Sequence, residues 1–273
     1  MISWVSVVTC AKRGQYLEAT IESLESGGAA LCNKRVLFVD GPAEGFLDRF
    51  PGWDVVSVSP VAARGARLAM VEIMRLAHAA GVQLLLYFED DIQVCTNAIR
   101  AMLEIGVPRE LGFVSYCDLL WHPCPPLELA AFPGCPREHP VADGGFVGCQ
   151  ALAIPARTLE AFTTWQAPPW LARDPNNCDG TMGQIAPRYG ILDSLANHIG
   201  DMSAIMGLAY GPRLRVVRGW RGEDFDADTL PRTWTLGDPG ERCTFHAGVL
   251  HADRRACASS HPDQARAGAA SYA

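Results

Sequence analysis

The sequence predicts an α/β fold in which helices flank a mainly parallel β-sheet. Short apolar, β-branched segments alternate with segments of helical periodicity through the N-terminal part of the chain, and parallel strands require such crossover connections. A continuous apolar strand, Gln83–Phe88, ends abruptly in three acids. The chain has 273 residues, 49% of them hydrophobic, which is enough for one large core.

The N-terminal elements follow one another in a regular order. Ser3–Thr9 is a β-branched strand, and apolar residues recur at helical spacing between Tyr16 and Leu24. The next strand, Arg35–Asp40, leaves Asp40 at its carboxyl end, where open α/β sheets bind ligands. The other elements expected here are a strand at 55–58, a helix at 65–80 and the strand at 83–88.

The rest of the chain is less regular. Strands are expected at 112–117 and 150–154, and Pro155 opens a helix that reaches Phe162. The Pro-rich and Gly-rich residues 122–148 predict a long irregular insertion that serves as a substrate loop. A further helical segment lies within 180–197, broken near Pro187, and the chain beyond Gly211 is polar and without clear periodicity.

Charge and composition narrow the class of protein. The net charge of −7 gives no general basic field, so we expect no nucleic-acid partner. No segment reaches the roughly 18 apolar residues of a membrane span, and the first residues do not resemble a signal peptide. We therefore expect a soluble, cytoplasmic protein. Its ten cysteines lack the paired spacing of a disulfide framework and are expected to be reduced.

The triplet Glu89-Asp90-Asp91 directly follows the apolar strand. Burying three unpaired carboxylates is too costly, so the triplet is expected at a sheet edge or loop, paired or bound to a metal. Because side chains alternate along a strand, Glu89 and Asp91 are expected to point the same way and to present two carboxylates to one hard cation. The alternative is a solvated acidic strand end that caps the following helix.

Five segments, in this order, resemble the GT-A superfamily of glycosyltransferases, in particular its bacterial family-2-like members. They are Ser6–Thr9, Phe38–Asp40, Arg64–Ala80, Leu84–Asp91 and Gly148–Pro155. The resemblance implies a GT-A fold and a nucleotide-sugar donor. It also matches the triplet to the family's DxD-type motif, with Glu89 in place of the first Asp, which implies Mn²⁺ or Mg²⁺ as cofactor with Glu89 and Asp91 as ligands.

The same resemblance implies contacts with the donor. Thr9 and Asp40 would touch its base or ribose, and Asp90 is expected to bind the donor with them. Arg64 and Arg67 resemble family positions that touch the base or the phosphates, and guanidinium groups suit phosphate oxygens. Alternatively, both arginines are solvated residues at the start of a helix.

Asp179 lies in a polar loop that opens a helix, which resembles the place where GT-A enzymes carry their catalytic base. An inverting transfer needs a carboxylate that takes the proton from the attacking acceptor hydroxyl. The alternative is that Asp179 caps this helix by accepting a hydrogen bond from the amide of Thr181 or Met182.

His198 begins a segment that resembles the "HIG..S" segment of related bacterial transferases, in which a histidine reaches towards the metal or diphosphate. Imidazole binds manganese or zinc well and magnesium weakly. A lone histidine is also often structural. Further on, residues 218–226 could form a lid over the donor. The C-terminal part also contains several Cys and His residues, and their spacing matches no closed zinc site. They are Cys243, His246, His251, Cys257 and His261.

Together these observations predict a GT-A catalytic domain at 1–211, with a donor half at about 1–118 and an acceptor half at about 119–211, and an extension or lid at 212–273. The expected activity is metal-dependent, inverting transfer, of hexosyltransferase type, from a UDP-sugar to an unknown small molecule, glycan or peptide. One alternative is a nucleotidyltransferase. Enzymes of that class use a Lys-containing phosphate loop, which Cys10–Gly14 faintly resembles. Another is a non-catalytic carbohydrate-binding protein.

Overall fold

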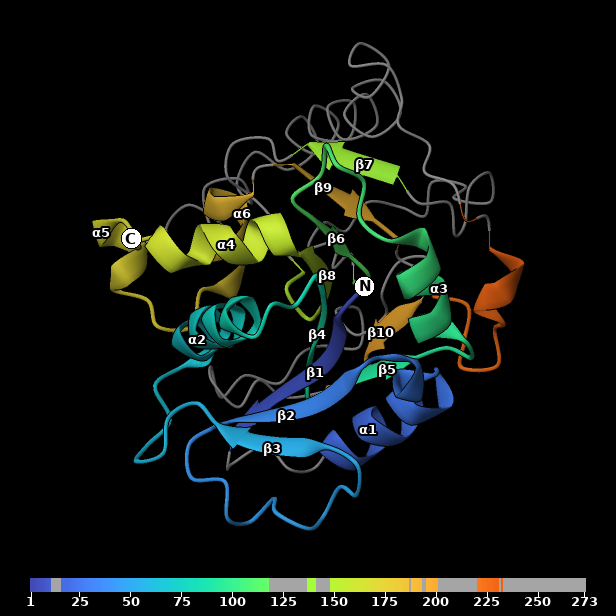
Figure 1. Ribbon diagram of the computed structural model, residues 1–273, viewed down its shortest axis with the longest axis horizontal. Helices are drawn as coiled ribbons and strands as arrows, with labels where there is room; N and C mark the ends of the chain where they lie inside the picture. Colours follow the sequence, from blue (N-terminus) through green and yellow to red (C-terminus); the bar gives the residue numbers. More distant parts are fainter. Residues whose placement is uncertain are drawn as a thin grey trace, which may run out of the picture.

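The computed structural model describes residues 1–10, 16–117, 137–140, 148–186, 188–192, 195–200, 220–230 and 232. These residues form an eight-stranded sheet in the order β3-β2-β1-β4-β8-β6-β9-β7 and a separate two-stranded sheet. Helices cover both faces of the large sheet (Figure 1). The predicted α/β architecture is therefore confirmed.

The N-terminal half of the sheet is entirely parallel. Its strands are β1 (Ser3–Cys10), β2 (Lys34–Asp40), β3 (Asp54–Ser57) and β4 (Leu84–Glu89), and each pairing among them is parallel. The crossovers include α1 (Leu17–Ser26), η1 (Ala29–Leu31) and α2 (Ala66–Ala79). The four strands are neighbours, as the alternating sequence pattern predicts.

The other half of the sheet is mixed. It consists of β6 (Phe113–Ser115), β7 (Arg137–Pro140), β8 (Ala151–Pro155) and β9 (Arg188–Ile191). Strand β8 is antiparallel to both β4 and β6, whereas β6 and β9 are parallel. The small sheet pairs β5 (Ile92–Val94) with β10 (Ala196–His198).

Two sequence-based expectations meet a mixed outcome in this half. The helical segment expected within 180–197 is confirmed as α6 (Cys178–Ile185), which ends before Pro187 as predicted, but strands β9 and β10 follow the break instead of further helix. The stretch 122–148, expected to be irregular, contains β7, while most of it lies outside the described residues. Strand β9 pairs with β6 on one side and with β7 on the other, and such long-range pairing leaves little trace in local sequence.

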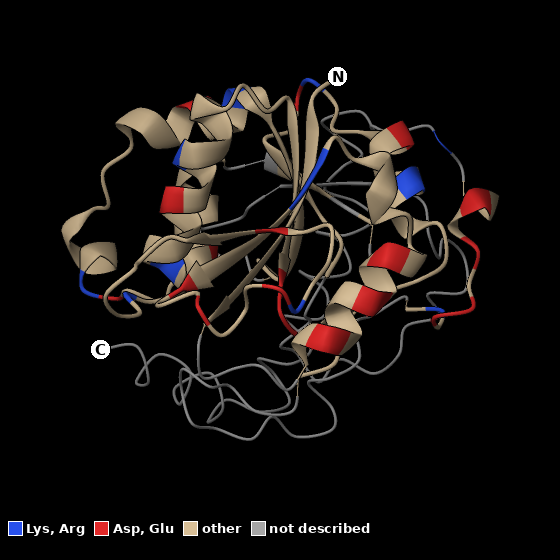
Figure 2. Cartoon of the chain, turned by 60° about the horizontal axis from the view of Figure 1, so that its bottom comes forward, with Lys and Arg blue, Asp and Glu red and all other residues tan. Residues whose placement is uncertain are grey.

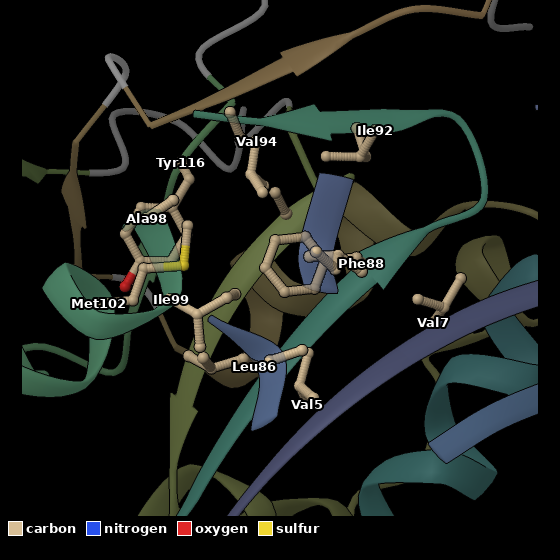
Figure 3. Close-up of a cluster of buried hydrophobic side chains, with 14 of the residues drawn as sticks. Val5, Val7, Leu86, Phe88, Ile92, Val94, Ala98, Ile99, Met102 and Tyr116 are labelled. Carbon is tan, nitrogen blue, oxygen red and sulfur yellow. The ribbon is translucent and has the colours of Figure 1, made fainter. Parts of the chain in front are cut away.

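Each face of the large sheet carries its own apolar core. Because side chains alternate along β4, Leu86 and Phe88 enter one cluster and Leu85 and Tyr87 the other. The first cluster includes side chains of β1, β4 and α3 (Ala98–Ile105) (Figure 3). The second lies under α2, α4 (Ala156–Thr164) and α6, with the short helix α5 (Pro169–Ala172) between α4 and α6 in sequence.

Helix α1 carries a row of glutamates (Figure 2). Glu18 forms an ion pair with Arg49 at 2.8 Å, and Glu25 contacts both Arg35, at 2.9 Å, and the Trp53 indole N–H, at 2.6 Å. Its opposite face is apolar and buried in the first core. These contacts hold α1 against β2 and against the segment between β2 and β3.

Residues 220–230 return to the domain and pack beside α3. Trp220 and Phe225 lie against the first core, and the Thr96 amide donates to the Glu223 carbonyl at 3.0 Å. The segment ends in the short helix η4 (Ala227–Thr229). The described part of the expected lid is therefore anchored at α3, while Arg218 and the Cys and His residues from Cys243 onward lie outside the described residues.

None of the six cysteines in the described part of the chain forms a disulfide. Across the same residues, no helix combines the length and apolar character needed to cross a membrane.

Candidate active site

The predicted site residues gather where the parallel strands end. Thr9 closes β1, Asp40 closes β2 and Glu89 closes β4. Because these strands are parallel neighbours, their carboxyl ends meet at one edge of the sheet, where ligands of α/β proteins bind.

Asp90 and Asp91 form the turn between β4 and β5, and both are buried. Thr20 of α1 holds this turn, since its hydroxyl donates to the Asp90 carbonyl at 2.9 Å and accepts from the Ile92 amide at 3.1 Å. Thr20 is not among the site residues predicted from the sequence. The sequence feature that could have identified Thr20 is a polar residue among Leu17, Ile21 and Leu24 on the buried face of an amphipathic helix.

Asp91 and His198 lie in contact, with Nε2 of the imidazole 3.1 Å from Oδ2 of the carboxylate. The pairing of β5 with β10 places His198 opposite Ile92, and the Ile199 amide donates to the Asp91 carbonyl at 2.8 Å. Gly200 packs on the same carboxylate, because a Cβ there would lie only 2.2 Å from Oδ2. The structure thus joins two of the three expected metal ligands. The rest of the "HIG..S" segment, from Asp201 onward, lies outside the described residues.

Glu89 is the last residue of β4. Strand alternation therefore does not extend to Asp91, and the expectation that Glu89 and Asp91 point the same way stays a prediction. Glu89 shares a face of β4 with Tyr87, where burial raises the pKa of the phenol and the Glu89 charge adds to the effect. Within the described ranges, no three His, Cys, Asp or Glu side chains are grouped so that they could hold a metal ion.

The Asp91–His198 pair nevertheless fits a divalent cation. Neighbouring ligands of an octahedral ion, each at about 2.1 Å, lie about 3 Å apart, which matches the 3.1 Å between the two donor atoms. Carboxylate oxygen and imidazole nitrogen together suit manganese better than magnesium. Two protein ligands also leave positions for ligand oxygens.

Two of the expected donor-binding residues contact each other. The Thr9 hydroxyl donates to Oδ2 of Asp90 at 2.5 Å, and both side chains are buried. This bond ties the end of β1 to the acidic turn. Asp90 thereby faces β1, while Asp91 faces β10.

Asp40 holds the loop before α2. Its carboxylate accepts hydrogen bonds from the amides of Arg64, at 2.9 Å, and Gly65, at 2.8 Å. The Arg64 guanidinium bonds to its own loop, through Ser59 and the Val58 carbonyl. The contacts of Asp40 and Arg64 with a nucleotide remain predictions.

Arg67 is buried, and its Nε donates to the Asp174 carbonyl at 2.8 Å. The alternative that Arg67 is a solvated helix residue is therefore wrong. The Arg67 amide also donates to the Pro175 carbonyl at 2.9 Å, and the Ala66 amide to Asn176 Oδ1 at 3.2 Å. The start of α2 is thus attached to the loop that leads to Asp179.

Asp179 does not cap α6. Asn177 is the cap, since its Oδ1 accepts from the Gly180 amide at 2.7 Å. Oδ1 of Asp179 instead accepts from the amides of Gly148, at 3.1 Å, and Cys149, at 3.0 Å. Burial raises the pKa of Asp179, and these hydrogen bonds oppose the rise. A raised carboxylate pKa is typical of a general base.

Comparisons with known proteins bear on the fold. No protein-family model matches the sequence, and a search of the curated proteins finds no match. The structure of Staphylococcus aureus TarS 1-349 in complex with UDP-GlcNAc is similar, with a TM-score of 0.50 and 11% identity over 77% of this chain and 62% of that chain.

A longer TarS structure has a TM-score of 0.48 and 10% identity, over 74% of this chain and 37% of that chain. LgtC, a galactosyltransferase in complex with donor and acceptor sugar analogues, has a TM-score of 0.41 and 12% identity, over 70% and 73% of the two chains. The chain therefore spans less than two thirds of either TarS structure. At such low identity the likeness concerns the fold alone, and in its fold the chain is a GT-A protein.

Proposed function

We propose that this protein is a glycosyltransferase that transfers a sugar, of hexosyl type, from a nucleoside diphosphate donor to an acceptor hydroxyl. The observation that carries the proposal is the buried Asp91–His198 pair at the carboxyl end of β4. A UDP-sugar is the first donor to test, because the similar TarS structure holds UDP-GlcNAc. The acceptor class, a small molecule, glycan or peptide, is open.

Asp91 and His198 would hold Mn²⁺ or, less well, Mg²⁺. Such an ion, when bound, supplies positive charge that stabilises a leaving diphosphate. Thr20 holds the backbone of the turn that carries Asp91, and Gly200 packs on the Asp91 carboxylate. Thr9, Asp40, Asp90, Arg64 and Arg67 are proposed to bind the nucleotide, and Glu89 is the third proposed metal ligand.

Asp179 is the proposed base of an inverting reaction. Its carboxylate would take the proton of the acceptor hydroxyl while the hydroxyl oxygen attacks the anomeric carbon from the face opposite the diphosphate. Two backbone amides hold Oδ1, and the Cys149 side chain also hydrogen-bonds to the carboxylate, so Asp179 is fixed in one orientation for this role. Burial of Asp179 raises its pKa and so makes its carboxylate a stronger base.

The test is turnover of UDP-glucose, UDP-galactose and UDP-GlcNAc with manganese and without added acceptor, so that water takes the acceptor's place. Metal-dependent release of UDP supports transfer. In a parallel assay with UTP and a sugar 1-phosphate, release of pyrophosphate with formation of the UDP-sugar supports a nucleotidyltransferase instead. Failure to bind UDP with or without manganese supports a non-catalytic carbohydrate-binding protein.

The variants Asp91→Asn and Asp179→Asn separate binding from chemistry. We expect Asp91→Asn to lose metal-dependent UDP affinity, and Asp179→Asn to keep it while turnover falls on the order of 10²-fold or more. Unchanged UDP affinity in Asp91→Asn would remove the metal from the proposal, and near-normal turnover in Asp179→Asn would remove the base.

A further inference from the structure

Gly148 occupies a position that only glycine fits. Its φ is +132°, and a Cβ there would lie 2.2 Å from the Cys117 carbonyl oxygen. Side chains larger than hydrogen are thus excluded by both backbone conformation and contact. The Ser115 hydroxyl supports the turn, since it lies 3.0 Å from the Cys117 carbonyl and 3.1 Å from the Gly148 carbonyl.

This turn aims two consecutive amides at one carboxylate oxygen. The Gly148 and Cys149 N–H groups both donate to Oδ1 of Asp179, although Gly148 and Asp179 lie 31 residues apart in sequence. The Asn177 cap orients the start of α6 independently. Asp179 is therefore held from two sides, by its own helix and by the residues that lead into β8.

We propose that Gly148 is a positioning residue for Asp179: it allows the amides of residues 148 and 149 to hold Oδ1, which fixes the carboxylate for proton transfer from the acceptor hydroxyl. The inference rests on the proposed function, in which Asp179 is the base. Gly148 acts only through Asp179 and makes no substrate contact in this proposal.

The amides also affect the basicity of Asp179. Hydrogen bonds to a carboxylate favour its charged form, so they limit the rise that burial causes in the pKa of Asp179. Among the described residues, two thiols interact with Asp179. Cys149, which leads into β8, hydrogen-bonds to the carboxylate through its side chain, and Cys178 precedes Asp179 on α6. Burial raises the pKa of both thiols well above the ordinary value, so they stay neutral at pH 7. The charges of Glu89 on β4 and Arg67 on α2 act on Cys178.

The test compares Gly148→Ala with Gly81→Ala. Both sites have positive φ, but a Cβ at Gly81 meets nothing within 4 Å, so this control carries the backbone strain without the displaced turn. In Gly148→Ala we expect the acidic limb of the pH profile for UDP-sugar turnover to move up by about one pH unit, because weakened amide bonds no longer favour the carboxylate. The control should keep the wild-type profile.

A second readout does not depend on turnover. The pKa of Asp179 follows from the pH dependence of unfolding, measured for each protein against the same protein carrying Asp179→Asn. It should rise in Gly148→Ala. If Gly148→Ala does not fold, Ser115→Ala loosens the same turn without backbone strain and should raise this pKa by a smaller amount.

The outcomes are distinguishable. An Asp179 pKa that is unchanged in Gly148→Ala and Ser115→Ala, or that rises equally in Gly81→Ala, overturns the inference even if the enzyme turns over UDP-sugars. A raised pKa in a protein that turns over no UDP-sugar supports the positioning contact and refutes the UDP-sugar as donor.

Discussion

Gly200→Ala is the sharpest test of how the Asp91–His198 pair is built. An alanine Cβ would lie 2.2 Å from Asp91 Oδ2 and 2.9 Å from its Cγ, whereas ordinary contact begins at 3.4 Å. The carboxylate must therefore retreat by 3.4 minus 2.2, or 1.2 Å. A shift of that size is large compared with the 3.1 Å contact to His198 Nε2.

Two magnitudes follow from this displacement. Overpacking of a buried site costs about 1–3 kcal/mol of unfolding free energy. Loss of a contact that orients a metal ligand costs about 10-fold to 100-fold in metal affinity, and we expect Mn²⁺ binding in the presence of UDP to weaken by that factor.

Calorimetric titration of Mn²⁺ and urea denaturation measure the two effects. Gly45→Ala is the matched control, because a Cβ there meets nothing within 4 Å and no positive φ strains it. In an Asp91→Ala background the clash is gone, so Gly200→Ala should cost little stability. The reasoning is refuted if Gly200→Ala binds Mn²⁺ as Gly45→Ala does, or if its full stability cost persists without Asp91.

Three further variants test neighbouring contacts. Thr20→Val should lower the unfolding free energy by about 1–3 kcal/mol in urea denaturation, because the Asp90 carbonyl and the Ile92 amide lose their partner. The control is the exposed Thr163→Val, for which a change within about 0.5 kcal/mol is expected. An equally small effect of Thr20→Val would contradict the prediction. Asn177→Ala should cost about 1 kcal/mol by the same measurement, since it removes the α6 cap; no loss would show that the cap is dispensable. Asp179→Asn should raise Tm at pH 7. Burial raises the pKa of Asp179, so the ionised carboxylate destabilises the folded protein at that pH, and a neutral amide removes this cost. The stability of the wild type falls as pH rises from the unfolded pKa through the folded one, so the difference in Tm should vanish near pH 4 and its persistence there would contradict the assignment.

Local sequence was sufficient for the parallel half of the fold. Each strand there is a continuous apolar run and each crossover helix has an apolar stripe, and both patterns arise within a few neighbouring residues. The abrupt change from apolar to acidic residues also located Asp40 and the acidic triplet at strand ends. The resemblance of five ordered segments added the GT-A fold, which the similarity to TarS confirms.

Only the tertiary structure decided how these residues face one another. Asp91 meets His198 because β5 pairs with β10, and Asp179 meets Gly148 because α6 packs beside the start of β8. Strand β4 includes Glu89 and ends there, one residue beyond the apolar run that predicted it. Such contacts join residues distant in sequence, and their geometry depends on packing and strand pairing that no local pattern records.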